Sequence, residues 1–167
     1  MVPALSDNIS TLLRRTADSA VLCREIALLL PAFLAQAHRL PEELRRPDPN
    51  GYRRSLLHED YDGAFSIGCF VWSPGQYTPI HDHTGWGVIG VAAGALRETS
   101  YSLENGHPVA QGSKRLASGV CAWCLPDEGD IHRVGADGTE TALSIHIYGA
   151  RFATVCRTRY AEAGVPA

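Results

Sequence analysis

The sequence has no excess of basic residues and no long hydrophobic run. Its 167 residues include 15 lysines and arginines against 18 aspartates and glutamates, which gives a formal net charge of −3. Proteins that bind nucleic acid or an anionic membrane surface usually carry a basic patch, so we expect neither partner. The longest apolar stretch, residues 26–35, contains Pro31 and has about half the roughly 20 residues of a membrane-spanning helix.

A secretory signal is also missing, since no basic region precedes an apolar run at the N-terminus. The five cysteines are an odd number, which favours reduced thiols over a disulfide framework. These two features predict a cytoplasmic protein. The length is that of one compact domain, and 45% hydrophobic residues are enough for an apolar core.

Residues 1–50 are expected to form a helical cap. Asp7 and Ser19 are each predicted to cap a helix, because each precedes apolar residues at helical spacing. Pro31 and Pro41 suit the first turns of further short helices better than a helix interior. A Pro-Asp-Pro-Asn-Gly sequence then ends the helical pattern.

Residues 51–167 change to the alternating pattern of β-strands and are expected to complete one domain with the cap. Turn signals at Asn105-Gly106, Glu128-Gly129 and Asp137-Gly138 separate short strands. No helix-length pattern lies between these strands, so a sandwich or small barrel is favoured over a parallel sheet. The predicted strands are 65–71, 78–83, 87–93, 96–103, 120–125 and 141–148.

His81 and His83 are the first residues that point to chemistry. Positions i and i+2 of a strand face the same side, so both imidazoles are expected to enter one cavity. Two ligands of one metal ion would have this arrangement. Two surface histidines before a turn, or two hydrogen-bonded core histidines, would give the same pattern.

The residues around this pair resemble the first motif of the cupin superfamily. There, Pro-Gly precedes His-x-His, and Glu and Gly follow at fixed spacings; here Pro74-Gly75 and Gly94 match, whereas Gly87 replaces the Glu. The second cupin motif, Gly-x-x-His, matches residues 129–132. The resemblance implies a mainly β protein built on a single cupin β-barrel, a double-stranded β-helix, behind the helical cap. The metal ligands that it implies are His81, His83 and His132.

The replacement of the cupin Glu by Gly87 affects the expected metal chemistry. Three neutral imidazoles leave several coordination positions open and keep the full charge of a divalent ion, which favours anionic ligands such as thiolate and leaves room for O2. The same three ligands could hold zinc with a water molecule. Ligand types alone therefore do not decide between iron and zinc.

A row of polar residues marks the last predicted strand. Ser144, His146 and Tyr148 share one face of this strand, and apolar residues occupy the other face. A half-exposed strand would show the same alternation. With a metal cavity nearby, we expect Ser144 to fix the tautomer of His146, and His146 to hold Tyr148 as a proton donor above the metal.

Several stretches together resemble the thiol dioxygenases, the cupin family typified by cysteine dioxygenase and 3-mercaptopropionate dioxygenase. This family lacks the cupin Glu and has a Ser-x-His-x-Tyr strand. The resemblance implies Fe(II) as the cofactor, a small thiol and O2 as substrates, and a sulfinic acid as the product. The matching stretches are 52–58, 72–76, 79–84, 86–87 and 144–149.

The expected substrate-binding residues resemble both branches of this family. Arg54 matches the arginine that binds the substrate carboxylate in cysteine dioxygenases, whereas Arg157 aligns with that of the mercaptopropionate enzymes. Trp86 lies beside the ligands in sequence and is expected to wall the pocket. In mammalian cysteine dioxygenases, a cysteine matching Gly87 forms a thioether with the tyrosine matching Tyr148, so we expect no such crosslink. The substrate stays open between cysteine and 3-mercaptopropionate.

Two other functions stay open. One is a different metal-dependent cupin enzyme, such as an isomerase or decarboxylase, which would need a base or a fourth protein ligand near the metal. The other is a non-catalytic cupin that binds a small ligand and has no use for the polar row.

Cys121 and Cys124 have no second cysteine pair and are predicted to pack in the core. The protein is expected to be a monomer or a small homo-oligomer.

Overall fold

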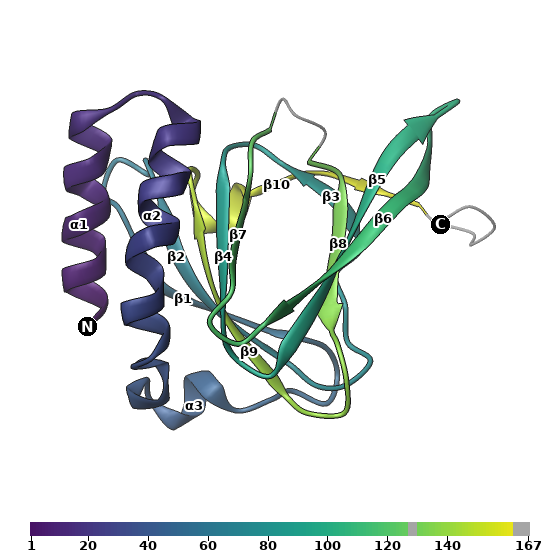
Figure 1. Cartoon of the computed structure of the whole chain (residues 1–167), viewed down its shortest axis with the longest axis horizontal. Helices are drawn as coiled ribbons and strands as arrows, with labels where there is room; N and C mark the ends of the chain where they lie inside the picture. The colour runs from purple at the N-terminus through teal and green to yellow at the C-terminus, as the bar shows by residue number, and fades with distance from the viewer. Residues whose placement is uncertain (127–129, 162–167) are drawn as a thin grey trace.

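A computed structural model describes residues 1–126 and 130–161, and these residues form two five-stranded antiparallel sheets behind a pair of helices (Figure 1). The first sheet has the strand order β1-β2-β9-β4-β7, and the second has the order β10-β3-β8-β5-β6. The helices are α1 Val2–Arg15, α2 Ser19–Leu34 and α3 Glu42–Arg45, with short 3-10 helices η1 Ala37–Arg39 and η2 Phe152–Thr154. The strands are β1 Arg53–Glu59, β2 Ser66–Trp72, β3 Ile80–His83, β4 Gly87–Ala93, β5 Ala95–Glu104, β6 His107–Ala117, β7 Cys121–Cys124, β8 His132–Ala136, β9 Ala142–Tyr148 and β10 Cys156–Tyr160.

The helical region differs from its prediction in three details. Asp7 lies inside α1 and does not cap it, because the helix already begins at Val2. The cap of α2 is Asp18, whose carboxylate accepts hydrogen bonds from two backbone N–H groups of the first turn, so Ser19 is the first helical residue. Pro31 lies within α2, where burial of apolar residues on both sides of it keeps the helix continuous. Pro41 precedes the first turn of α3, as predicted.

The first sheet is covered on both faces. Its outer face packs under α2, and α1 lies beside α2 (Figure 1). The central strands β2 and β9 are buried along their whole length, because their outward side chains meet the helices and their inward side chains line the space between the two sheets. Leu143, Ile145 and Ile147 therefore belong to the helix-covered core, which leaves the other face of β9 for polar residues.

The sequence located most of the first sheet but missed four of the described strands. The predicted strands correspond to β2, β3, β4, β5, β7 and β9, whereas β1, β6, β8 and β10 carry little alternation. Asn105-Gly106 forms the turn between β5 and β6, with both residues at positive φ. The predicted Glu128-Gly129 turn lies outside the described residues. No helix within residues 1–126 and 130–161 combines the length and hydropathy of a membrane span.

Candidate metal centre

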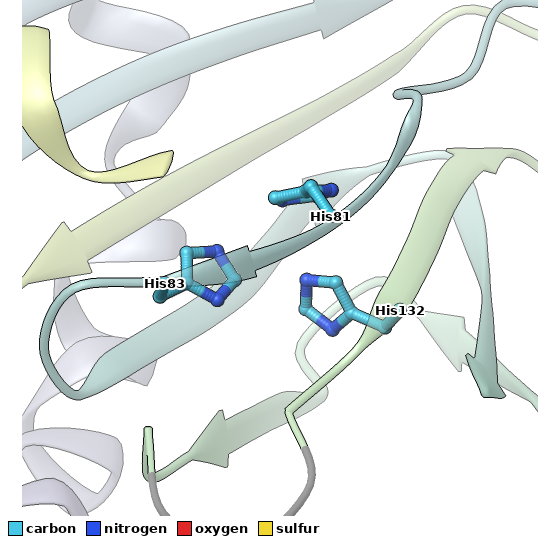
Figure 2. Close-up of side chains that lie close together, drawn as sticks. All are labelled: His81, His83 and His132. Atoms are coloured by element: carbon cyan, nitrogen blue, oxygen red, sulfur yellow. The ribbon is translucent and has the colours of Figure 1, made fainter. Parts of the chain in front are cut away.

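Three histidines meet on the inner face of the second sheet. His81 and His83 come from β3, and His132 comes from β8, directly opposite His81 in the antiparallel register. The centres of the three rings are 4.8–4.9 Å apart, and Figure 2 shows the rings gathered around one point. One nitrogen from each ring lies within 4.8 Å of the other two, so these side chains could hold one metal ion.

A hydrogen-bond acceptor lies beside the Nδ1 atom of each of these rings. When Nδ1–H donates to an oxygen, Nε2 of the neutral imidazole keeps its lone pair and becomes the metal ligand. Carboxylates beside such rings also raise their basicity as ligands. The three pairs are His81 with the Pro79 carbonyl oxygen at 3.0 Å, His83 with Asp130 Oδ2 at 3.2 Å, and His132 with Glu98 Oε1 at 3.3 Å.

The charge environment keeps two of these rings neutral. Burial, with the two neighbouring imidazoles, lowers the pKa of His81 from 6.5 to about 3. Burial also lowers the pKa of His83, although Asp130 opposes this shift. Neutral imidazole is the form that binds a metal, so these two histidines are available as metal ligands.

The donor set fits a divalent transition metal. Three imidazole nitrogens suit iron and zinc alike, and Gly87 offers no fourth ligand. A Cβ built on Gly87 would lie 3.4 Å from Cys124 Sγ and 3.4 Å from the Tyr148 ring, so this glycine separates the two side chains.

The polar row of β9 forms a continuous hydrogen-bonded chain beside the histidines. Trp72 Nε1 donates to Ser144 Oγ at 2.9 Å, Ser144 Oγ lies 2.9 Å from His146 Nε2, and His146 Nδ1 lies 2.8 Å from the Tyr148 hydroxyl. Because Trp72 can only donate, the Ser144 proton is available for His146 Nε2, and His146 Nδ1–H then donates to the Tyr148 oxygen. The Tyr148 proton is left to point into the cavity.

Burial determines the protonation of this row. It raises the pKa of Tyr148 above its usual range and holds the pKa of His146 well below its usual range. The Phe70 ring stacks on His146 with centres 3.9 Å apart, and the Tyr148 ring stacks on His83 at 5.6 Å. Tyr148 is therefore a neutral donor fixed beside a candidate metal ligand.

A cavity lies above the histidines, and Arg54 lines it. The guanidinium carbon of Arg54 lies 4.9 Å from the centre of the Phe152 ring and 5.3 Å from that of Phe70. Its Nη2 donates to the Phe152 carbonyl oxygen at 3.4 Å. The aromatic rings thus hold this cation at the cavity without neutralising it.

The other two expected substrate contacts lie away from the cavity. Arg157 donates through Nε and Nη2 to Asp82 Oδ2 at 3.1 and 2.8 Å and does not line the cavity. Trp86 is 7% exposed and packs in the helix-covered core, against Gly149. Trp86 lies in the segment between β3 and β4, and its side chain belongs to the helix-covered core although it is next to the ligands in sequence.

Several residues at the site carried no recognised signal in the sequence. Arg159 lines the cavity, and Glu98 and Asp130 hold two of the histidines. Cys124, expected in the core, also lines the cavity, with Sγ 3.9 Å from His83 Nδ1, and burial raises its pKa to about 12. Asp130 could have been recognised from its sequence position, because it precedes His132 by two residues on the segment that enters β8.

Comparison with known proteins places this site in a family. Residues 4–162 match the family model of cysteine dioxygenase type I. Cysteine dioxygenase type 1 of Danio rerio is 32% identical over 118 residues, covering 66% of this chain and 57% of that protein. The Homo sapiens enzyme of the same name is 30% identical over 112 residues, covering 64% and 55%. The matched segment thus spans little more than half the length of these relatives.

Solved structures agree with the fold. A protein with a double-stranded β-helix domain from Klebsiella pneumoniae superposes with a TM-score of 0.54 at 19% identity, covering 72% of this chain and 88% of that one. A cupin superfamily protein from Desulfitobacterium hafniense superposes with a TM-score of 0.50 at 12% identity, covering 64% and 84%. These likenesses confirm the mainly β, cupin-type fold, and the family match confirms the resemblance found in the sequence. The chain belongs to the cysteine dioxygenase type I family.

Proposed function

We propose that the protein is an Fe(II)-dependent thiol dioxygenase that converts a small carboxylated thiol and O2 into a sulfinic acid. Both oxygen atoms enter the product, and the sulfur supplies all the electrons that reduce O2, so no further reductant is needed. The observation that carries this proposal is a three-histidine site with every Nδ1 hydrogen-bonded, next to a buried tyrosine and an unneutralised arginine.

His81, His83 and His132 would hold the iron through their Nε2 atoms. Bound Fe(II) supplies the redox chemistry that joins O2 to the substrate sulfur. The protein contributes a shaped cavity and a ligand set without negative charge, which favours binding of a substrate thiolate.

Arg54 is the residue best placed to bind the substrate carboxylate. Its guanidinium can make two parallel hydrogen bonds to a carboxylate, and this pairing fixes the direction of the sulfur. The rings of Phe70 and Phe152 restrict its movement. Arg157 is bonded to Asp82, which argues against a second carboxylate anchor at that position.

Tyr148 would hold a proton directed at the reacting atoms. Its raised pKa keeps the phenol protonated, so it acts as a hydrogen-bond donor and not as a base. His146 and Ser144 keep the hydroxyl in place through the chain that begins at Trp72.

The cavity is less suited to an isomerase or decarboxylase. Among its described lining residues, Glu98 is the one carboxylate, and it binds both His132 and Lys114. Those contacts lower the pKa of Glu98 although burial opposes them, so it is a poor base. We further propose that the enzyme is cytoplasmic, since all five cysteines are free thiols. We also propose that it is a monomer or a small homo-oligomer.

The test is an oxygen-electrode assay of Fe(II)-loaded protein with cysteine, 3-mercaptopropionate and cysteamine. We expect O2 uptake with at least one of the two acids and a product heavier than the thiol by two oxygen atoms. Cysteamine has no carboxylate and should react poorly. The matched control is His132→Ala, which should lose iron and O2 uptake while its circular dichroism stays that of wild type. Iron-loaded protein that oxidises none of these thiols would refute the proposal.

A further inference from the structure

Arg159 enters the cavity because of an irregularity in β10. This strand pairs with β3, with Cys156 opposite His83 and Arg159 opposite His81. The two steps from His83 to His81 thus face three steps from Cys156 to Arg159, which is a β-bulge. Directly paired residues of antiparallel strands point to the same side of the sheet, so Arg159 shares the inner face with His81.

The neighbouring arginine is fixed on the outer face. Asp82 lies between the two β3 histidines and is 2% exposed. It accepts hydrogen bonds from Arg157, from the Thr158 backbone N–H at 2.7 Å and from the Tyr160 hydroxyl at 2.9 Å. These bonds hold β10 in the bulged register, which turns Arg159 and not Arg157 toward the cavity.

The Arg159 guanidinium has no partner in the described part of the chain. No hydrogen bond or ion pair is formed by this side chain with residues 1–126 or 130–161, and the side chain is exposed at the cavity mouth. The one described carboxylate that lines the cavity, Glu98, binds His132 and Lys114. Arg54 has carbonyl and aromatic contacts only. The cavity therefore contains two cations that no described carboxylate neutralises.

The two arginines act on different parts of the cavity. The guanidinium carbon of Arg54 lies 5.3 Å from the centre of the Phe70 ring, and Phe70 stacks on His146, so Arg54 lies on the side of the polar row of β9. Arg159 lies across the β10–β3 pair, beside His81. Arg54 thus comes from β1 of the first sheet and Arg159 from β10 of the second sheet, so each can take a separate carboxylate.

We propose that Arg159 is a second carboxylate-binding residue and that the preferred substrate is a thiol with two carboxylates, one bound by Arg54 and the other by Arg159. The inference rests on the proposed dioxygenase function and names the substrate class of the same site. The reaction is unchanged, because sulfur and O2 form a sulfinic acid and both carboxylates stay intact.

The test uses two thiols that differ by one carboxylate. Mercaptosuccinate is 3-mercaptopropionate with a second carboxylate on the thiol-bearing carbon. For the Fe(II)-loaded wild type, kcat/KM should be at least about tenfold higher for the diacid. Arg159→Gln should lower the ratio of the two kcat/KM values by about 10- to 100-fold, the scale of a lost charge-assisted pair. The control is Arg115→Gln. It also removes one positive charge, but Arg115 lies on β6, forms an ion pair with Asp137 and does not line the cavity, so the ratio should stay unchanged.

Binding is measured separately by calorimetry without O2. Wild type should bind mercaptosuccinate more tightly than 3-mercaptopropionate, and Arg159→Gln should abolish the difference. A wild type that prefers the monoacid, or a ratio that Arg159→Gln leaves unchanged, would overturn the inference while the oxidation of either thiol still supports the dioxygenase. If neither thiol is oxidised, the proposed function fails, and the binding difference alone then decides the role of Arg159.

Discussion

Asp130→Asn tests whether a buried carboxylate sets the metal affinity of His83. Asp130 Oδ2 accepts from the His83 backbone N–H at 2.9 Å and from its Nδ1 at 3.2 Å, and the Asp130 side chain is 1% exposed. Asparagine keeps the shape and one acceptor oxygen but removes the negative charge. Both charge-assisted bonds then become neutral ones, and His83 becomes a weaker ligand.

The expected loss is about 10- to 100-fold in Fe(II) affinity, the range for substitutions of groups that orient metal ligands. Asp130→Ala removes the acceptor as well and leaves buried N–H groups unpaired. It should therefore also lower the free energy of unfolding by about 1–3 kcal/mol, whereas Asp130→Asn should change it less. The comparison of the two variants separates the effect of charge on the metal from the effect of the hydrogen bonds on the fold.

Fe(II) affinity is measured anaerobically by competition with a chelator, and stability by urea unfolding of the metal-free protein. Asp137→Asn is the control, since Asp137 pairs with Arg97 and Arg115 at the surface and touches no histidine of the site. Wild-type Fe(II) affinity in Asp130→Asn would refute the reasoning, because it would show that the carboxylate does not support the ligand.

Four further outcomes are expected. Tyr148→Phe should keep its iron and lose about 10- to 100-fold in turnover, as measured by O2 uptake and metal analysis; equal turnover would make the hydroxyl structural. Mass spectrometry of reduced, denatured protein after many turnovers should show no thioether on Tyr148; a crosslink to Cys124 or another cysteine would contradict this. Because the pKa of His81 is about 3 in the folded protein and 6.5 in the unfolded chain, protonation favours unfolding below pH 6.5. The metal-free protein should lose stability as the pH falls from 6.5 toward 3, and a flat urea midpoint across that range would contradict the shift. Arg54→Ala should lower kcat/KM for carboxylated thiols by an amount equivalent to about 2–5 kcal/mol of transition-state binding, and should leave kcat/KM for cysteamine unchanged. Arg157→Ala should lower kcat/KM for the acids much less. The reverse order would exchange the roles of the two arginines.

The sequence predicted the parts of the site that follow strand alternation. His81 and His83 lie two residues apart on one strand, and the β9 row continues the same rule, so the period of a strand suffices to place each group on one face. The resemblance to cupins added His132, which lies opposite His81 although it is distant in the sequence.

The parts that could not be predicted depend on contacts between strands. The bulge in β10 brings Arg159 instead of Arg157 to the cavity, and the sequence around these residues gives no indication of an extra residue in the strand. Glu98 lies on β5, which the sequence predicted as a strand, but it becomes a partner of His132 only through the β5–β8 pairing. Pro31 was predicted to start a helix, but tertiary packing keeps α2 continuous through it.

The opposed faces of β3 have a consequence for how this protein can diverge. The inner face holds two histidines of the candidate metal centre, and Asp82 on the outer face binds β10 through Arg157, Thr158 and Tyr160. The register of β10 is thus maintained without any contribution from the side chain at position 159. Substitutions of Arg159, the proposed carboxylate-binding residue, would alter which acids are accepted while the three histidines and the strand pairing stay as they are, so the substrate range could evolve, or be engineered, separately from the candidate metal centre.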